Sequence, residues 1–177
     1  MLFNAPLSGW RADRLIDLLD LPDGARVLEV GCGRGEFLLR LAARWRCTAL
    51  GIDINAPAIA AAQQSAADRK LDVAFVCGDA KLTPMKTVDL AVCIGATHAY
   101  GVGAGAWHNT LRVFSRLVRP GGQILIGEGF WAQPPAPEYL ALLGDNPGIE
   151  KTHHENITSA EELGLIPLYA ARSSPDE

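Results

Sequence analysis

The sequence has no long hydrophobic run, and this absence removes the membrane-spanning classes from consideration. No stretch of the 177 residues approaches the ~20 consecutive apolar residues that a helix needs to cross a bilayer. The N-terminus also lacks the charged start and apolar centre of a secretory signal peptide. We therefore expect a cytoplasmic protein with no membrane partner.

The sequence also lacks a basic stripe. The formal net charge is −4, whereas nucleic-acid-binding surfaces usually carry a positive patch. The densest basic cluster, Arg40 to Arg46, falls in a helical pattern, where it is expected to form a solvated face. We therefore expect no nucleic-acid partner.

Metal-binding and disulfide patterns are missing as well. Four cysteines occur without C-x-x-C spacing, at Cys32, Cys47, Cys77 and Cys93. They fall on or beside predicted strands, so we interpret them as small buried hydrophobic residues in a reducing compartment. The adjacent pair His153 and His154 makes a poor chelate and is assigned to a surface loop. We expect no metal.

Strand and helix patterns alternate along the first two thirds of the chain. Strands are predicted at Val27–Val30, Thr48–Asp53, Val73–Val76, Val88–Ile94 and Gln123–Gly127. Helices are predicted from a Ser8 cap to Leu19 and over Glu36–Trp45, Pro57–Lys70 and Trp107–Val118, with the turn Pro120-Gly121-Gly122 ending the last one. This alternation predicts an α/β, Rossmann-like, doubly wound and mostly parallel sheet with helices on both faces.

The pattern after Gly129 is less regular. We predict a short helix near Glu138 to Leu143 and another that begins at the capping box Ser159-Ala160-Glu161-Glu162. Leu165 to Ala170 is a candidate sixth strand.

The most informative motif joins the first predicted strand to the helix that follows it. In Glu29-Val30-Gly31-Cys32-Gly33-Arg34-Gly35, three alternating glycines follow the strand and a helical pattern begins at once. Such a turn directs backbone N–H groups and the positive end of a helix at an open crevice. A dinucleotide fold has the spacing G-x-G-x-x-G, whereas the third glycine here comes one position early. The spacing therefore speaks against a dinucleotide.

Acidic residues follow the predicted strands at the edge of a parallel sheet where ligands bind. The Asp53 carboxylate can accept hydrogen bonds from two ribose hydroxyls, or it can cap the next helix. Asp79 can accept a hydrogen bond from an adenine amino group while the Ala80 N–H reaches a ring nitrogen, or it can be a turn residue. Glu29 lies inside its strand, where an unpaired carboxylate is costly. We interpret it as an acceptor for loop N–H groups or as the partner of a cationic ligand group such as an α-ammonium.

In their order along the chain, these motifs resemble those of class I S-adenosylmethionine-dependent methyltransferases. The resemblance covers about residues 25 to 128 and is carried by Glu29–Gly35, Gly51-Ile52-Asp53, Cys77-Gly78-Asp79-Ala80, Val88-Asp89-Leu90 and Leu117–Gly122. It implies S-adenosylmethionine as the methyl donor and S-adenosylhomocysteine as the product. It also implies cofactor contacts at Glu29, Gly31, Cys32, Gly33, Gly35, Asp53, Ile54, Gly78, Asp79, Ala80 and Gly95.

We interpret residues 1–177 as a single methyltransferase domain. Residues 1–24 are an N-terminal helix and lead-in, 25–128 the cofactor-binding core and 129–177 an acceptor-side segment. The family's sheet usually has a sixth strand and a seventh, antiparallel one, but the sequence has no residues for a seventh. Either it is a piece of a longer chain or the last strand is absent. The fifth strand would then keep an open edge, through which two copies can pair as a homo-oligomer.

Methyl transfer from a sulfonium is an in-line displacement in which the protein mainly aligns the reactants, and a base is needed only if the acceptor must lose a proton. His98 is a candidate base because imidazole takes up protons near neutral pH; alternatively it shapes the pocket. Glu128 is a second candidate, and its alternative is a carboxylate bonded to the loop.

Aromatic side chains can line an acceptor pocket or simply pack in the core or a lid. They are Trp10, Tyr100, Phe130, Trp131 and Tyr139. The alanine- and glycine-rich loop after the fourth strand leaves room for a compact acceptor, so the sequence predicts methyl transfer to a small molecule. Two other hypotheses stay open: a cofactor-binding module without methyltransferase activity, and an NAD-dependent oxidoreductase.

Overall fold

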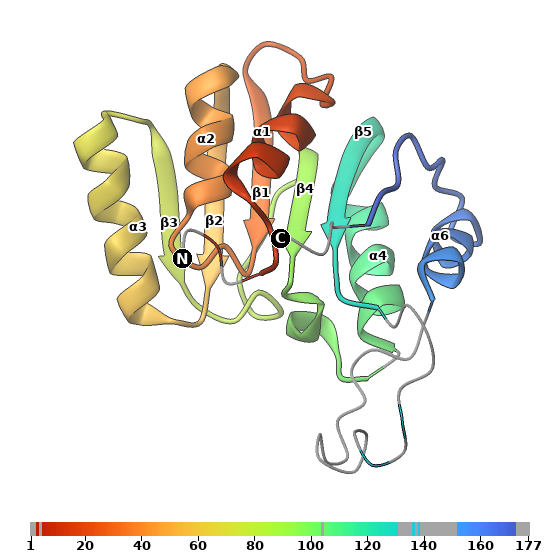
Figure 1. Ribbon diagram of the computed structural model, residues 1–177. Helices are drawn as coiled ribbons and strands as arrows, with labels where there is room; N and C mark the ends of the chain where they lie inside the picture. Colours follow the sequence, from red (N-terminus) through yellow and green to blue (C-terminus); the bar gives the residue numbers. More distant parts are fainter. Residues whose placement is uncertain are drawn as a thin grey trace.

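A single parallel sheet organises the protein. The computed structural model describes residues 3, 5–103, 105–130, 136, 138 and 152–172. Within them the sheet has five strands in the order β3-β2-β1-β4-β5, and helices cover both of its faces (Figure 1). All four strand pairings are parallel. The predicted fold class is therefore confirmed.

The strands form where the apolar patterns indicate. They are β1 (Ala25–Val30), β2 (Cys47–Asp53), β3 (Val73–Cys77), β4 (Val88–Ile94) and β5 (Val118–Gly127). β4 matches its predicted bounds, because its continuous apolar run suits a strand that is covered on both faces. Its four central residues are completely buried.

β5 begins five residues earlier than predicted, directly after α4. Val88 pairs with Val118 and Leu90 with Gln123, so β5 has four residues where β4 has only Asp89. The predicted Pro-Gly-Gly turn is therefore an irregularity inside the strand rather than its boundary. Arg119, within the extra segment, donates from Nε to the Asp89 carboxylate and holds the irregularity against β4.

The helices also follow the predicted order. They are α1 (Gly9–Asp17), α2 (Glu36–Arg44), α3 (Ala56–Arg69), α4 (Gly105–Leu117) and α6 (His153–Glu161), with a 3-10 turn η1 (Thr97–Tyr100) after β4. Ser8 caps α1 as predicted, because its side chain accepts the Arg11 N–H. No helix among the described residues is long and apolar enough to cross a membrane.

Each face of the sheet has its own apolar core. Beneath α1, α2 and α3 the cluster includes Ile16, Phe37 and Leu90, and beneath α4 it includes Leu28 and Phe114. Burying one such side chain stabilises a fold by about 1.5–3 kcal/mol. The expectation that all cysteines are buried is wrong: Cys32 and Cys93 are, whereas Cys47 is half-buried and Cys77 exposed.

The prediction for α6 was wrong about its start. Its capping box is formed by Thr152 and Glu155, so His153 and His154 begin a helix instead of lying in a loop. Ser159 lies inside the helix and donates to the Asn156 carbonyl at 3.1 Å. That carbonyl also accepts the Trp107 indole N–H of α4 at 3.1 Å, which fixes the helix on its neighbour.

The predicted sixth strand over Leu165 to Ala170 is wrong. The structure assigns no strand within residues 152–172, where Ile166 is 82% and Leu168 77% exposed. Between them Pro167 has no N–H for a strand ladder. Of the helix predicted near residues 138–143, only Glu138 lies among the described residues.

Candidate functional site

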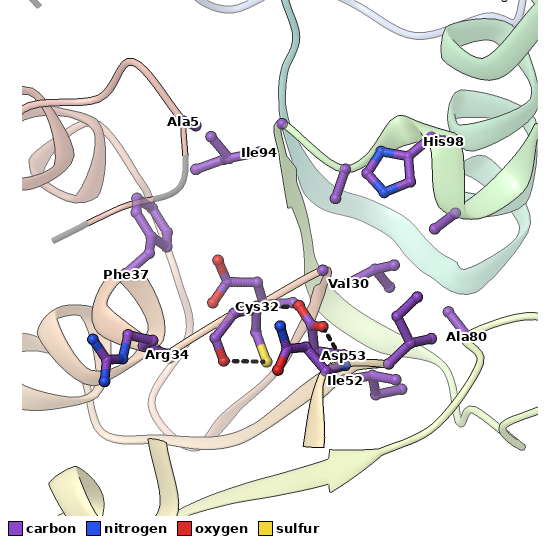
Figure 2. Close-up of a pocket in the computed structure, with 18 of the residues that line it drawn as sticks. Ala5, Val30, Cys32, Arg34, Phe37, Ile52, Asp53, Ala80, Ile94 and His98 are labelled. Carbon is purple, nitrogen blue, oxygen red and sulfur yellow. Dashed lines mark hydrogen bonds between the residues drawn. The ribbon is translucent and has the colours of Figure 1, made fainter. Parts of the chain in front are cut away.

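A cavity of about 550 Å³ lies where β1, β2, β3 and β4 end. The strand order reverses between β1 and β4, and in open parallel sheets ligands bind at such a point. Figure 2 shows side chains from these strand ends directed into one space. Except for Gly35, the predicted cofactor residues all line it: Glu29, Gly31, Cys32, Gly33, Asp53, Ile54, Gly78, Asp79, Ala80 and Gly95.

The glycine loop after β1 forms the part of the wall that needs the smallest residues. Gly31 has a φ of +70°, and a Cβ there would lie 2.1 Å from the Cβ of Ala96. The loops after β1 and β4 are therefore in direct contact. Gly35 serves α2 instead: it is the N-cap, and a Cβ there would meet the Phe75 ring at 2.4 Å.

Asp53 at the end of β2 holds the glycine loop and faces the cavity. Its carboxylate accepts the Gly33 N–H at 2.7 Å and the Asn55 N–H at 2.8 Å. A carboxylate has about four acceptor positions, so further donors can bind. The alternative role as a helix cap is taken by Asn55, whose side chain accepts the Ala58 N–H.

Asp79 after β3 is a turn residue that also lines the cavity. Its side chain accepts the Lys81 N–H at 2.8 Å, and its carbonyl accepts the Thr83 hydroxyl at 2.8 Å. The neighbouring Ala80 is buried. The turn fixes the direction of the carboxylate and of the Ala80 backbone, so the two interpretations of Asp79 are compatible.

Glu29 is the most unusual group in the cavity wall. The residue is only 4% exposed, and its Oε2 atom has no hydrogen-bond partner among the described residues. Burial raises the pKa of this carboxyl from 4.5 to about 8; a hydrogen bond from the Leu38 backbone opposes the rise and the charge of Asp53 adds to it. An acid with an unused oxygen is costly in such a place, and a ligand that donates to it removes that cost.

The two candidate bases lie in different surroundings. His98 in η1 is exposed and lines the cavity (Figure 2), whereas Glu128 is not in the lining. One Glu128 oxygen accepts the Thr97 hydroxyl at 2.6 Å and the Thr97 N–H at 3.1 Å, and the other accepts the Gly129 N–H. This geometry favours the loop-bonded alternative for Glu128, in which it fixes the turn that carries His98.

Some lining residues carried no local signal in the sequence. Phe3, Ala5 and Leu7 ahead of α1 line the cavity, but none of the described residues after 128 does. Glu36 also lines the cavity. Its i,i+4 spacing from Arg40 indicates an ion pair on one face of a helix, but the spacing does not show that this face lies toward the cavity.

The proposed aromatic pocket is not formed by the aromatics that the structure describes. Trp10 is 70% exposed, Tyr100 packs edge-on against Phe114, and Phe130 lies against His153. Trp131 and Tyr139 lie outside the described residues. Among those described, no three metal-ligating side chains come together.

Comparison with known proteins gives consistent matches. A family model described as a methyltransferase domain matches residues 27–122. The chain is 35% identical over 127 residues to the uncharacterized protein YjhP of Escherichia coli K12, covering 70% of this chain and 50% of that protein. It is 31% identical over 126 residues to 27-O-demethylrifamycin SV methyltransferase of Amycolatopsis mediterranei, covering 70% and 46%. The chain thus spans about half the length of these curated relatives.

Among solved structures, similarity extends over nearly the whole chain. A SAM-dependent methyltransferase from Geobacter sulfurreducens, crystallised with S-adenosyl-L-homocysteine, superposes with a TM-score of 0.80 at 32% identity. The match covers 92% of this chain and 66% of that one.

Proposed function

The chain belongs to the class I S-adenosylmethionine-dependent methyltransferases, and from this we propose that it transfers a methyl group to a small-molecule acceptor. Family membership was predicted from the motif order and is confirmed. The cofactor of the family is S-adenosylmethionine, and the residues of the cavity fit its chemistry. The identity of the acceptor and the roles of single residues belong to the proposal.

The observation that carries the proposal is the unused, buried oxygen of Glu29 in the cavity wall. An α-ammonium group offers N–H donors and a positive charge, and it would therefore satisfy this oxygen and favour the ionised acid. NAD has N–H donors in its carboxamide and adenine amino groups, but these are neutral, and it has no ammonium that combines N–H donors with a positive charge on one atom. Glu29 thus supports an amino-acid end on the ligand, in agreement with the glycine spacing.

The remaining groups suit the other parts of S-adenosylmethionine. Asp53, held by the Gly33 and Asn55 N–H groups, has acceptor positions left for the ribose hydroxyls. Asp79 and Ala80 offer an acceptor and a backbone donor for the adenine edge. When bound, the cofactor supplies an activated methyl on a sulfonium; the protein supplies alignment.

His98 is the residue that we assign to proton removal when the acceptor is a hydroxyl or an amine. It stands on the cavity wall, and the Thr97–Glu128 hydrogen bonds hold its turn in place. Thr97 is 3% exposed, so loss of the carboxylate would leave buried donors unsatisfied. Glu128 thereby acts as a positioning residue.

A small-molecule acceptor is supported by the size of the cavity and by the relative named for a rifamycin substrate. Part of the 550 Å³ must hold the cofactor, which leaves room for a compact acceptor group.

Product formation tests the proposal. The protein is incubated with S-adenosylmethionine and a panel of hydroxyl, carboxyl, amine and thiol acceptors, and S-adenosylhomocysteine is quantified. We expect one acceptor class to give turnover, which Asp53→Ala abolishes and the exposed control Asp72→Ala preserves. Tight cofactor binding with no product on any acceptor would favour a binding module, and preferential NAD binding would overturn the proposal.

A further inference from the structure

One positive charge of the cavity wall has no partner among the described residues. Arg34 follows Gly33 in the glycine loop, lines the cavity and is exposed. Its guanidinium makes no hydrogen bond and no ion pair with any residue that the structure describes. A guanidinium presents five N–H donors in a planar fork that matches the two oxygens of a carboxylate. Arg34 is therefore suited to an anionic group of a ligand in the cavity.

The acid that lies closest to Arg34 along the chain is bonded to other arginines. One Glu36 oxygen accepts from the Arg40 Nε at 2.7 Å, and the other accepts from Arg69 of α3 at 2.6 Å. Arg40 also donates to both oxygens of Asp13 at 3.0 Å, and its side chain is only 25% exposed. The basic cluster is therefore not a purely solvated face as predicted. Glu36 is neutralised without Arg34, which keeps its donors for a ligand.

The strand order indicates which part of a nucleoside ligand lies near Arg34. Ala80 follows β3, Asp53 ends β2 and the glycine loop follows β1, and these strands are neighbours in the order β3-β2-β1. Figure 2 shows Ala80, Asp53 and Arg34 in this order from right to left across the cavity. With the adenine at Ala80 and the ribose at Asp53, the amino-acid end of the ligand extends toward the loop that carries Arg34.

The unused oxygen of Glu29 belongs to the same part of the cavity, because Glu29 is in β1. An amino acid carries its ammonium and its carboxylate on one carbon, so a ligand whose ammonium reaches Glu29 holds its carboxylate close by. Lys81, the other lysine or arginine among the described lining residues, follows Ala80 at the adenine end. α2 begins directly after Arg34, and its N-cap Gly35 makes no side-chain cap hydrogen bond. The positive end of this helix adds to the attraction for an anion.

We propose that Arg34 binds the carboxylate of the ligand's amino-acid end, and that Arg34 and Glu29 together select a zwitterionic ligand. The inference rests on the proposed function, because the cavity is taken to hold S-adenosylmethionine. Holding both charged groups fixes the tail of the cofactor and with it the direction of the sulfonium methyl. Arg34 thereby discriminates against nucleosides that carry an ammonium but no carboxylate.

Two ligands that differ only in the carboxylate test the inference. S-adenosylhomocysteine has both charged groups, whereas its decarboxylated analogue keeps the ammonium alone. Calorimetry should show that the wild type binds the analogue about tenfold more weakly, the effect of one hydrogen bond to a charged group. In Arg34→Gln the affinity for S-adenosylhomocysteine should fall about tenfold, while the affinity for the analogue stays at the wild-type value. A damaged fold would weaken both ligands, so this pattern separates recognition of the carboxylate from a structural role.

Two further variants serve as matched controls. Lys81→Gln removes the other cation of the described lining, and the ratio of the two affinities should stay as in the wild type. Glu29→Gln should weaken both ligands, because both carry the ammonium. Equal binding of the two ligands by the wild type overturns the inference, as does an Arg34→Gln variant that binds S-adenosylhomocysteine like the wild type or loses both ligands equally. If the wild type binds no S-adenosylhomocysteine at all, the proposed function fails instead, so the two failures are distinguishable.

Discussion

Replacing Glu29 by glutamine should weaken ligand binding and change how the stability of the fold depends on pH. The pKa of this carboxyl is about 8 in the ligand-free fold against 4.5 ordinarily, because burial disfavours its charge. The difference corresponds to at most about 5 kcal/mol in favour of the neutral acid. Glu29→Gln keeps the shape but cannot ionise, and it should lose affinity for a ligand with an α-ammonium group.

The sign of the pH dependence follows from the raised pKa. Between pH 4.5 and about 8 the folded protein holds a proton that the unfolded chain has lost, so stability falls as pH rises. The stabilising contribution is complete below pH 4.5 and is lost as pH passes about 8. Because Glu29→Gln cannot ionise, its stability does not fall in this way. Denaturant unfolding should therefore show the free energy of unfolding of Glu29→Gln rising relative to that of the wild type between pH 5 and pH 9.

Ligand binding provides the most specific readout. At pH 7 a carboxyl with a pKa of about 8 is about nine-tenths protonated, and an ammonium placed beside it would drive that proton off. Calorimetry of S-adenosylhomocysteine in buffers of different ionisation enthalpy should show nearly one proton released per site. Adenosine, which lacks the amino-acid end, should release none, and neither should Glu29→Gln. Wild-type binding with no proton release would refute the assignment of the ammonium to Glu29.

Three further substitutions test other parts of the account. Gly31→Ala adds a Cβ at 2.1 Å from the Ala96 Cβ in a residue with φ +70°. The free energy of unfolding should fall by about 2–4 kcal/mol, and calorimetry should show a loss of ligand binding. The control Gly24→Ala, with φ +72° and open space around the new Cβ, should lower the free energy of unfolding by only about 1 kcal/mol. Asp89→Asn should cost about 1–3 kcal/mol with unchanged ligand affinity. Because hydrogen bonds from Arg119 and the Arg26 backbone lower the pKa of Asp89, its contribution is present above pH 3.8 and disappears as pH falls further; a variant as stable as the wild type at pH 7 would contradict this. His98→Ala should keep cofactor affinity within a few-fold but slow turnover, and an unchanged rate would remove its role as the base.

The central strands and the cofactor loops were predictable because their signals are local. β4 is an apolar run whose bounds follow from burial on both faces, and the glycine loop needs left-handed backbone at Gly31, Gly33 and Gly35. Polar residues after parallel strands meet at one edge of the sheet by topology alone. The positions of Asp53 and Asp79 at one edge of the sheet could therefore be predicted from the sequence.

Other parts depended on contacts between distant segments. Two capping-box patterns lie near α6, one at Ser159 and one at Thr152, and the helix begins at the one at Thr152. The Trp107 indole of α4 donates to the Asn156 carbonyl within that helix, a contact that the local pattern does not show. The turn expected before β5 became part of the strand because Arg119 binds Asp89 across the pairing. Phe3, Ala5 and Leu7 line the cavity, and α1 behind them packs on the core through Ala12 and Ile16. No pattern within α1 reveals this placement.

The most direct test of the central claim is a calorimetric titration of the wild-type protein with S-adenosylhomocysteine and, separately, with NAD. We predict saturable one-to-one binding of S-adenosylhomocysteine, with no binding of NAD at the same concentrations. Binding of NAD in preference to S-adenosylhomocysteine would contradict it.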